Sequence, residues 1–412
     1  MQPDAHKRAL IAGSIGNFIE WYEFAVYGFL ATVIAKNFFQ LEGEAGLTSL
    51  ILTYASFAIA FFFRPLGAVV FGRIGDRIGR KPTLIIVLVL MTLATAAIGI
   101  VPVYASIGIA APLIITLLRI LQGLFAGGEY GGAVSLMTEF APRGKRGLYG
   151  AWQSFTVALG LLAGAGIVAL LSALLTPEAL HDWGWRIPFF LALPMGAVAL
   201  WLRVSMEETP SFVQQQDKPT VAQADIAATL RAIVMGIGRV MVWSAAGYTY
   251  LVIMPTYLQS ALHTGFNQAL LIAVISNVGF ALTIIPSGIL SDRIGRRTVM
   301  IIATALLLIL ALPLLKLLQA ESIALAVKAV VVLIAGGLVG MLAGPGPAML
   351  SEMFPTRMRA IFSGCAGLII TGLIKQTGNL DIPAYYVMAT AVVSIFALMT
   401  LRKDDHLRSL EE

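Results

Sequence analysis

Cysteine, histidine and charged side chains are all scarce in this chain. The single cysteine, Cys365, excludes an intrachain disulfide and any C-x-x-C metal or redox motif. The four histidines fall in tails or predicted loops, too far apart in sequence to predict a metal cluster. Charged residues make up 12% of the chain and hydrophobic residues 58%, with a mean hydropathy of +0.86. This composition is far from that of a soluble domain and indicates an integral membrane protein.

Basic residues outnumber acidic ones, and the formal net charge is +6. The lysines and arginines collect in alternate loops, a distribution that argues against nucleic acid as a partner and indicates a lipid bilayer. The basic set of loops includes both chain ends, so both termini are expected in the cytoplasm. No cleavable signal peptide is expected, because the first apolar stretch is too long and carries Glu20 and Glu23.

About twelve apolar stretches, most near the roughly 20 residues that cross a bilayer, predict an all-α integral membrane protein with about twelve transmembrane helices. A polar segment at 205–231 is interpreted as a cytoplasmic linker between two six-helix bundles, 1–204 and 232–412. The eleventh helix is expected to be unusually short, because only about fifteen apolar residues follow Arg359. The expected spans are 9–35, 47–71, 82–103, 107–138, 148–175, 185–204, 232–258, 267–290, 298–318, 323–350, 360–374 and 383–401.

A ten-residue motif occurs twice: GRIGDRIGRK runs from Gly72 to Lys81, and GILSDRIGRR runs from Gly288 to Arg297. A repeat at about half the chain length predicts two related halves. Each copy is predicted to be a tight basic turn between helices, whose glycines permit a positive φ. The shared positions are Gly72, Asp76, Arg77, Gly79 and Arg80 in the first copy and Gly288, Asp292, Arg293, Gly295 and Arg296 in the second.

The acidic residue of each copy is a candidate latch for a cytoplasmic gate. Asp76 or Asp292 would pair with a loop arginine, such as Arg143 or Arg146, or with the N-terminus of a neighbouring helix. Such a contact would close the inner face and would break when the site opens inward. The alternative is a solvated turn without a gating role.

Ionisable residues at bilayer depth are costly and are therefore functional candidates. Those that stand out are Glu20, Glu23, Arg119 and Glu129. At about 1.5 Å per residue, Glu20 and Arg119 are both expected near mid-membrane, where they could meet. A carboxylate that exchanges between a proton and an arginine could couple proton flow to solute binding, whereas the alternative is a static ion pair. Arg64 is expected near the cytoplasmic end of its helix, with its side chain snorkelling to the surface.

Polar and aromatic side chains around these charges are candidates for a central site. Asn17 and Phe24 share the helix face of Glu20 by their spacing. Further candidates for lining a cavity are Trp21, Tyr27, Gln122, Gln153 and Tyr248. Glycine-rich patterns, such as Gly160 with Gly164, predict close helix packing, and the alternative is a flexible helix that bends during transport.

The doubled motif and several longer stretches resemble the metabolite:proton symporter branch of the major facilitator superfamily. The stretches are GNFIEWYEF (16–24), FRPLGAVVFGRIGDRIGRK (63–81), RILQGLFAGGEYGGA (119–133), DWGWRIPFFLALP (182–194), EETPSF (207–212) and SEMFPTRMRA (351–360). The resemblance implies two six-helix bundles around a central site, alternating access, and symport of a small organic solute with protons across the bacterial cytoplasmic membrane. It implies a monomer driven by the proton gradient without a cofactor. It also implies coupling roles for Glu20, Glu23, Arg119 and Glu129 and gate roles for Asp76 and Arg80.

Within this branch, WGWRIPFFLALP, YLVIMPTYL and IPAYYVMA are most similar to proline/betaine carriers, although dicarboxylate, citrate and shikimate carriers share most motifs. A zwitterion suits Arg119 for its carboxylate, with Glu20 and an aromatic face for its cation. A dicarboxylate would need a second fixed cation, and Arg239 and Lys328 are expected near helix ends. The family usually has aspartate at the position of Glu23. The tail after Leu401 is too short for the coiled coil of osmosensing carriers.

Three other functions are weighed against import. The superfamily motif alone permits an exporter of drugs or metabolites, but the symporter-branch stretches argue against it. A membrane-embedded enzyme would need a nucleophilic or metal constellation at membrane depth, and the sequence offers none. A receptor or scaffold that no longer transports remains an alternative because of the short eleventh helix.

Overall fold

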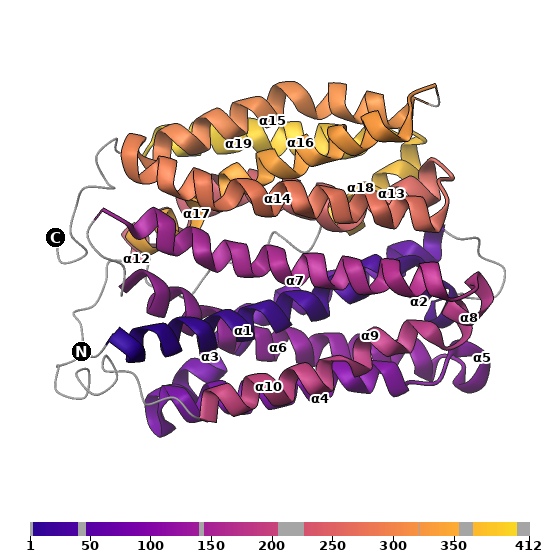
Figure 1. Ribbon diagram of the computed structural model, residues 1–412, viewed down its shortest axis with the longest axis horizontal. Helices are drawn as coiled ribbons and strands as arrows, with labels where there is room; N and C mark the ends of the chain where they lie inside the picture. Colours follow the sequence, from indigo (N-terminus) through magenta and orange to yellow (C-terminus); the bar gives the residue numbers. More distant parts are fainter. Residues whose placement is uncertain are drawn as a thin grey trace.

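The computed structural model describes residues 3–39, 47–139, 144–204, 226–320, 322–353 and 366–401, and every regular element in these ranges is a helix. The long helices lie side by side along one axis, with the first half of the chain on one side and the second half on the other (Figure 1). The first half contains α1 (Pro3–Phe29), α2 (Ala31–Phe38), α3 (Leu47–Ile78), α4 (Arg80–Ile100), α5 (Tyr104–Ile107), α6 (Ala110–Glu139), α7 (Arg146–Leu174), α8 (Pro177–Asp182), η1 (Gly184–Arg186), α9 (Ile187–Phe190) and α10 (Ala192–Val204). The second half contains α12 (Ile226–Gly247), η2 (Tyr248–Ile253), α13 (Met254–Ala261), α14 (Phe266–Ile294), α15 (Arg296–Gln319), α16 (Leu325–Ala343), α17 (Gly346–Met353), α18 (Ala366–Thr377) and α19 (Ile382–Met399).

The membrane-spanning character follows from helix length and composition. Within the described ranges, ten helices are long and apolar enough to cross a bilayer, and an eleventh is the pair Ser14–Phe29 and Ala31–Phe38, bent by 63°. The predicted eleventh span is represented by α18, a helix of 12 residues. Residues 354–365, which include the start of that predicted span, lie outside the described ranges. The protein is thus an all-α membrane protein, consistent with the predicted twelve-helix architecture.

The two halves repeat one packing arrangement. In the first half α3 packs along α6, and in the second half α14 packs along α16. The halves meet where α7 packs against α14. Lys81 donates to the Val204 carbonyl at 2.9 Å, and Arg297, at the same position of the repeat, donates to the Leu401 carbonyl at 3.1 Å. The last basic residue of each copy therefore contacts the end of the final helix of its own half.

Close packing of α6 on α3, and of α16 on α14, depends on glycine. A Cβ at Gly123 would lie 1.9 Å from the Ala60 carbonyl oxygen, and one at Gly336 would lie 1.9 Å from that of Ser276. A Cβ at Gly160 would likewise meet the Phe18 carbonyl oxygen of α1 at 2.5 Å. These contacts support the packing interpretation of the glycine patterns, since only a residue without a Cβ permits such backbone approach.

The doubled motif is mostly helical, so the predicted ten-residue turn is wrong. Helix α3 continues to Ile78 and α4 begins at Arg80, with Gly79 between them at φ 101°. In the second copy Gly295 separates α14 from α15 at φ 91°. A single glycine at positive φ reverses the chain, and basic side chains in the preceding turn suit the negative end of the helix dipole.

The start of α12 and its π-helical continuation also differ from expectation. Helix α12 begins at Ile226, inside the segment interpreted as linker. It continues through a π-helix, η2, whose Tyr250 and Leu251 carbonyls accept bonds from Ser276 and Asn277 of α14 at 3.1 and 3.2 Å. These side chains satisfy carbonyls that α-helical bonding would otherwise use. The α16–α17 break, at 344–345, contains Pro345, which lacks the backbone N–H needed to continue the helix.

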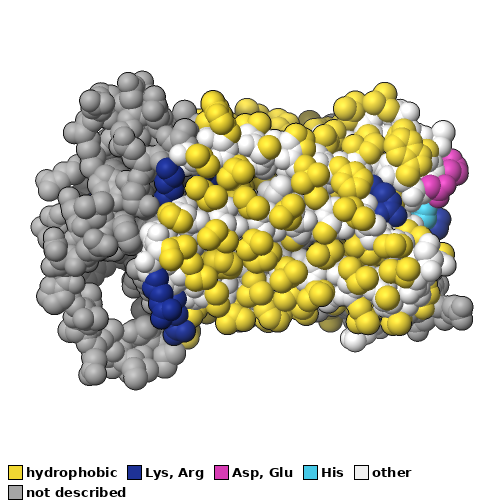
Figure 2. Space-filling view, turned by 90° about the horizontal axis from the view of Figure 1, so that it is seen from below, with side chains coloured by type: hydrophobic (Ala, Val, Ile, Leu, Met, Phe, Trp, Pro, Cys, Tyr) yellow, Lys and Arg dark blue, Asp and Glu magenta, His cyan; other side chains and the backbone are white. Residues whose placement is uncertain are grey.

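The two ends of the bundle differ in charge. We call the end where α3 and α14 finish the basic end, because it exposes Arg73, Arg77, Lys145 and Arg293. The described N-terminal helix starts and α19 finishes at this end (Figure 1). Between the ends, the surface in Figure 2 shows mainly hydrophobic side chains, and the acidic side chains near the opposite end lie beside a histidine and basic side chains. An apolar surface between charged ends fits a lipid bilayer.

Candidate functional site

Glu20 and Arg64 form a buried ion pair between α1 and α3. Arg64 Nη2 lies 2.8 Å from Glu20 Oε1, and the side chains are 7% and 1% exposed. The prediction that Arg64 snorkels to the surface is therefore wrong. It assumed that the helix ends near residue 71, whereas α3 continues to Ile78 and buries Arg64 about 20 Å from that end.

Arg119, on α6, is fully buried and held by neutral groups. Its Nη1 donates to Gln122 Oε1 at 2.7 Å, and its Nη2 donates to the Phe57 carbonyl at 3.5 Å. Gln122 in turn donates to Thr95 Oγ1 of α4 at 2.7 Å. The expected partner Glu20 is instead within ion-pair distance of Arg64. Counting residues along each helix predicted that Glu20 and Arg119 lie at the same depth in the membrane, but it could not specify the direction in which each side chain points.

Aromatic rings surround both guanidinium groups. The Cζ atom of Arg64 lies 4.5 Å from the ring centre of Phe24 and 4.6 Å from that of Phe61. The Cζ atom of Arg119 lies 4.7 Å from Phe24 and 4.4 Å from Tyr27. The ring faces offer partial negative charge, which offsets part of the cost of burying a cation.

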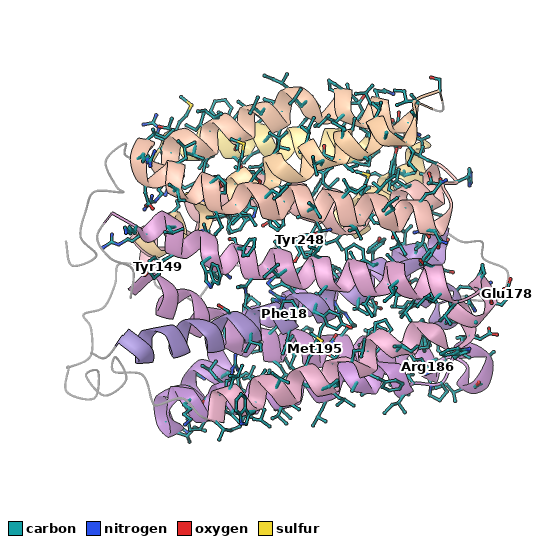
Figure 3. The ribbon with its side chains drawn as sticks, viewed as in Figure 1. Phe18, Tyr149, Glu178, Arg186, Met195 and Tyr248 are labelled. Carbon is teal, nitrogen blue, oxygen red and sulfur yellow. The ribbon has the colours of Figure 1, made fainter. Side chains whose placement is uncertain are left out.

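Tyr248, on η2, brings the second half of the chain to this site. Its ring centre lies 5.3 Å from Phe61, 6.2 Å from Phe57 and 6.3 Å from Trp21. Figure 3 places Tyr248 near the middle of the molecule's length, between the two halves. The predicted cavity candidates Trp21, Tyr27, Gln122 and Tyr248 are thus brought together around Arg64 and Arg119. We call this group, with Glu20, Phe24, Phe57 and Phe61, the central cluster.

The remaining coupling candidates lie in different surroundings. Asn17 donates to the Gln153 carbonyl at 3.1 Å and to Thr156 Oγ1 at 2.7 Å, contacts that join α1 to α7. Glu23 is buried on α1, with 1% exposure. Glu129 lies on α6, and its side chain is outside the described part of the chain.

Sequence reasoning missed Arg64, Phe57 and Phe61 as members of the site. A signal was available, because positions 57, 61 and 64 have the i, i+4, i+7 spacing of one helix face. That face carries two aromatic rings and a cation in the otherwise apolar stretch 57–71. Such a pattern is the one expected for a buried cation that packs on aromatic side chains.

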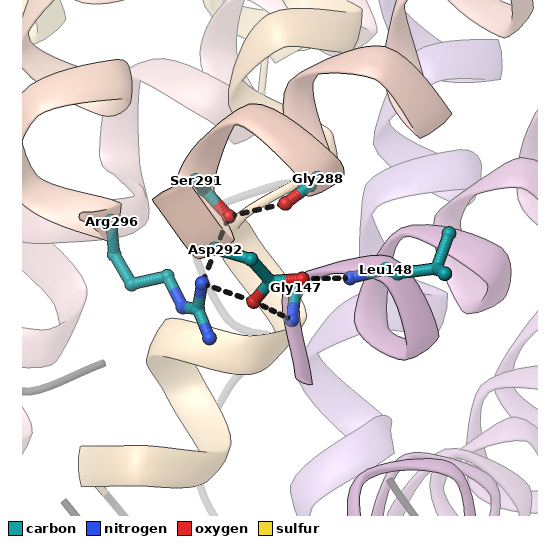
Figure 4. Close-up of polar contacts among 6 residues, drawn as sticks. All are labelled: Gly147, Leu148, Gly288, Ser291, Asp292 and Arg296. Atoms are coloured by element: carbon teal, nitrogen blue, oxygen red, sulfur yellow. Dashed lines mark hydrogen bonds and ion pairs between the residues drawn. The ribbon is translucent and has the colours of Figure 1, made fainter. Parts of the chain in front are cut away.

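Asp292 connects the two halves at the basic end (Figure 4). Its Oδ1 accepts from the Gly147 amide at 2.8 Å, and its Oδ2 accepts from the Leu148 amide at 3.0 Å. Arg296 donates to the same carboxylate at 2.7 Å. The carboxylate therefore lies at the N-terminus of α7, where free amides and the helix dipole favour negative charge.

The other predicted gate residues are only partly described. Gly72 and Gly79 belong to the helix end and the turn of the first copy, and Arg77 and Arg293 are exposed. Arg146 is the first residue of α7 and is half-buried. The side chains of Asp76 and Arg80, and all of Arg143, lie outside the described part.

The halves also contact each other at the opposite end. Thr32 of α2 donates to Gln259 Oε1 of α13 at 3.1 Å, and Lys375 of α18 donates to Thr48 of α3. Nearby, Lys316 Nζ lies 2.7 Å from Asp381 Oδ2, and this contact lowers the pKa of the Asp381 carboxyl. The central cluster thus lies between interhalf contacts at both ends of the molecule.

A bundle of membrane-spanning helices in two packed halves, with buried charges at its centre and contacts between the halves at each end, defines a polytopic membrane transporter. Residues 9–229 and 222–401 match the sugar (and other) transporter family. The chain belongs to this family of the major facilitator superfamily. Each half matching by itself agrees with the internal repeat.

Relatives and solved structures agree with this assignment. The chain is 35% identical to the proline/betaine transporter of Escherichia coli K12, with 96% of this chain and 83% of that protein covered. It is also 35% identical to the citrate-proton symporter of Salmonella typhi, with 95% and 93% covered. The fold is similar to that of the xylose transporter XylE from E. coli in a partially occluded inward-open conformation, with a TM-score of 0.78, 18% identity and 96% and 98% covered.

Proposed function

We propose that the protein is a proton-coupled symporter that imports a small zwitterion, such as proline or glycine betaine, by alternating access. The observation that carries this proposal is the central cluster, in which two buried cations and buried carboxylates lie among aromatic rings at the junction of the halves. The names of the E. coli and S. typhi relatives support solute transport and proton coupling. Glu20 and Glu23 are the proposed proton carriers, and Arg119 is the proposed carboxylate ligand.

A second candidate substrate is a dicarboxylate or tricarboxylate. The argument against it was the absence of a second fixed cation, and Arg64 overturns that argument because it is buried beside Arg119 around Phe24. The citrate-proton symporter of S. typhi is a relative of the same identity. We favour the zwitterion because Arg64 carries its own counter-ion, Glu20, whereas Arg119 is hydrogen-bonded to the neutral groups of Gln122 and Phe57.

The proposal includes an orientation and a gate. The basic end would face the cytoplasm, together with both termini, as the positive-inside rule requires. Asp292, at the N-terminus of α7, would hold that end closed and release it when the site opens inward. The chain would work as two bundles, 1–204 and 232–412, joined near the linker, as a monomer without a cofactor or enzymatic activity, in the bacterial inner membrane.

Uptake into proteoliposomes under an imposed inward proton gradient tests this function. The panel contains labelled betaine, proline, 2-oxoglutarate, citrate and shikimate, so that one experiment compares the two substrate classes. Betaine or proline uptake that collapses with a protonophore is expected. Citrate or 2-oxoglutarate uptake alone would favour the second candidate, and uptake that ignores the protonophore would contradict proton coupling. Folded, correctly inserted protein without uptake of any compound would favour the receptor or scaffold alternative.

A further inference from the structure

Arg64 is held by two kinds of contact that also recognise organic cations. One is the carboxylate of Glu20, with Oε1 at 2.8 Å from Nη2. The other is a set of ring faces, with Cζ at 4.5 Å from Phe24, 4.6 Å from Phe61 and 5.9 Å from Trp21. A carboxylate together with several aromatic faces is the arrangement by which proteins bind quaternary ammonium groups. We call Glu20, Trp21, Phe24 and Phe61 the cation box.

The cation box is preformed around Arg64 and shielded from solvent. Arg64 is 6% exposed and Glu20 and Phe24 are 1% and 2% exposed, so the guanidinium is separated from solvent. Tyr248 closes the box from the second half of the chain, since its ring lies 5.3 Å from that of Phe61. Alternating access moves the halves relative to each other, so a site with walls from both halves opens and closes with the transport cycle.

We propose that Arg64 is an internal ligand that occupies the subsite for the cationic group of the substrate. A zwitterion with a substituted ammonium group would displace the Arg64 guanidinium from the cation box. The displaced guanidinium would then be available, together with Arg119, for the substrate carboxylate. This proposal rests on the proposed function, because it assigns a subsite within a transporter of zwitterions.

The two arginines differ in a way that makes Arg64 the displaceable one. Arg119 is bonded to Gln122, which is itself bonded to Thr95, so neutral side chains of α4 and α6 fix its position. A substituted ammonium group cannot donate the hydrogen bonds that hold Arg119 to these neutral groups. Arg64 is paired with a carboxylate, and a second cation of similar size competes directly for that charge.

Equilibrium binding of radiolabelled choline to the purified full-length protein tests the proposal. Choline carries a quaternary ammonium group and lacks a carboxylate, so it reports the cation box alone. Arg64→Gln removes the internal ligand and should raise choline affinity about tenfold or more, because the cation that competes for the Glu20 carboxylate and the aromatic rings is gone. Arg64→Lys keeps the charge but loses the planar stacking, and should raise affinity by a smaller factor. Unchanged choline affinity in either folded variant would overturn the proposal.

Two further variants make the result specific. Glu20→Gln added to Arg64→Gln should abolish the gain, because the box then lacks its carboxylate; a gain that persists in the double variant would overturn the assignment of Glu20. Arg186→Gln is the matched control. The Cζ atom of Arg186 lies 4.4 Å from the ring centre of Trp185, and its guanidinium donates to the carbonyls of Gly99 and Val101, which lie outside the central cluster. Its choline affinity should equal that of the wild type, and a comparable gain there would also overturn the proposal.

Binding and transport readouts separate this proposal from the proposed function. Wild-type protein that takes up none of the tested zwitterions, with a choline gain in Arg64→Gln, would contradict the proposed substrate while supporting the cation box. Zwitterion uptake without any choline gain would support the proposed function and overturn the role of Arg64. The two hypotheses therefore fail in different experiments.

Discussion

Arg64 and Arg119 share one aromatic neighbour, because their Cζ atoms lie 4.5 and 4.7 Å from the ring centre of Phe24. Two like charges at such a place in a membrane protein each need their own compensation. Glu20 supplies it for Arg64, and Gln122 with the Phe57 carbonyl supplies it for Arg119. The direct contacts are unequal, an ion pair for Arg64 and hydrogen bonds to neutral groups for Arg119, and this inequality gives the two arginines different expected roles.

Arg119→Lys should reduce proton-driven uptake at least about tenfold with expression intact, because an ammonium cannot reproduce a guanidinium that is both hydrogen-bonded and stacked. The bond to Gln122 and the packing on Tyr27 would be lost together. Initial rates in proteoliposomes measure the effect, and Arg186→Lys serves as the control outside the cluster. Uptake retained at the wild-type rate would rule out the proposed role of Arg119.

Asp292→Ala should open the basic end more often. Loss of bonds to helix N-terminal amides costs about 0.5–2 kcal/mol, which corresponds to about a 2- to 30-fold change in population. A cysteine at Ser154, which is 2% exposed and bonds across the halves to the Ala343 carbonyl, reports this opening by maleimide labelling in a Cys365→Ser background. Labelling of Ser154→Cys should accelerate with Asp292→Ala.

The control for the latch is Asp182→Ala, because Asp182 is 75% exposed in α8, at the opposite end. This variant should leave the labelling rate of Ser154→Cys unchanged. Equal rates in Asp292→Ala and the parent protein would contradict a closing role for Asp292.

Gly336→Ala should destabilise the protein by about 1–3 kcal/mol, because the added methyl group would meet the Ser276 carbonyl oxygen of α14. Thermal unfolding in detergent, monitored by size-exclusion chromatography, measures the loss of stability. Gly166→Ala is the matched helix-interior control, since nothing lies within 4 Å of its Cβ position. Helix propensity favours alanine over glycine, so Gly166→Ala should not lose stability, and a comparable loss there would contradict close packing as the cause.

Asp381→Asn should lower the thermal stability at neutral pH and have less effect in acid. The Lys316 contact and the bond from Gln319 lower the pKa of the Asp381 carboxyl in the folded protein. The contribution is therefore present above the unfolded value of about 4 and is lost as pH falls through the lower folded value. It amounts to about 1 kcal/mol or less, because Lys316 is 56% exposed and the pair is screened.

Unfolding temperatures of the wild type and Asp381→Asn across a pH series measure this difference. The difference should be largest near neutral pH and should shrink below about pH 4. A difference that is constant with pH would mean that the aspartate acts through packing or hydrogen bonding without its charge.

The sequence predicted the class and the helices well, because long apolar stretches and a doubled motif depend on local composition. The positions of Glu20 and Arg119 along their helices were also predictable from chain spacing. The partner of Glu20 was not, since residue depth does not specify the rotation of a helix about its own axis. Arg64 was misplaced for a further reason: the end of α3 was predicted about seven residues too early.

Irregular elements were the hardest to predict. The 63° bend between α1 and α2 contains no proline at the point of change, and η2 ends two residues before Pro255. Their stability comes from neighbours distant in sequence, such as Ser276 and Asn277, which bond to the carbonyls of η2. A pattern read along one helix carries no information about donors on another. For the same reason, the sequence could not decide whether Asp292 pairs with Arg143, with Arg146 or with the N-terminal amides of a neighbouring helix.

Asp292 accepts hydrogen bonds from the main-chain amides of Gly147 and Leu148, and this affects which mutations can compensate for the loss of the contact. No substitution at 147 or 148 other than proline removes the amide N–H groups from which Asp292 accepts, so the two sides of this contact do not exchange compensating mutations. Position 147 is limited by size alone, since a Cβ there would lie 2.4 Å from the Gly288 carbonyl oxygen. Revertants of an Asp292 variant should therefore arise elsewhere in the chain, and covariation between positions 292 and 147 should be weak even though they touch.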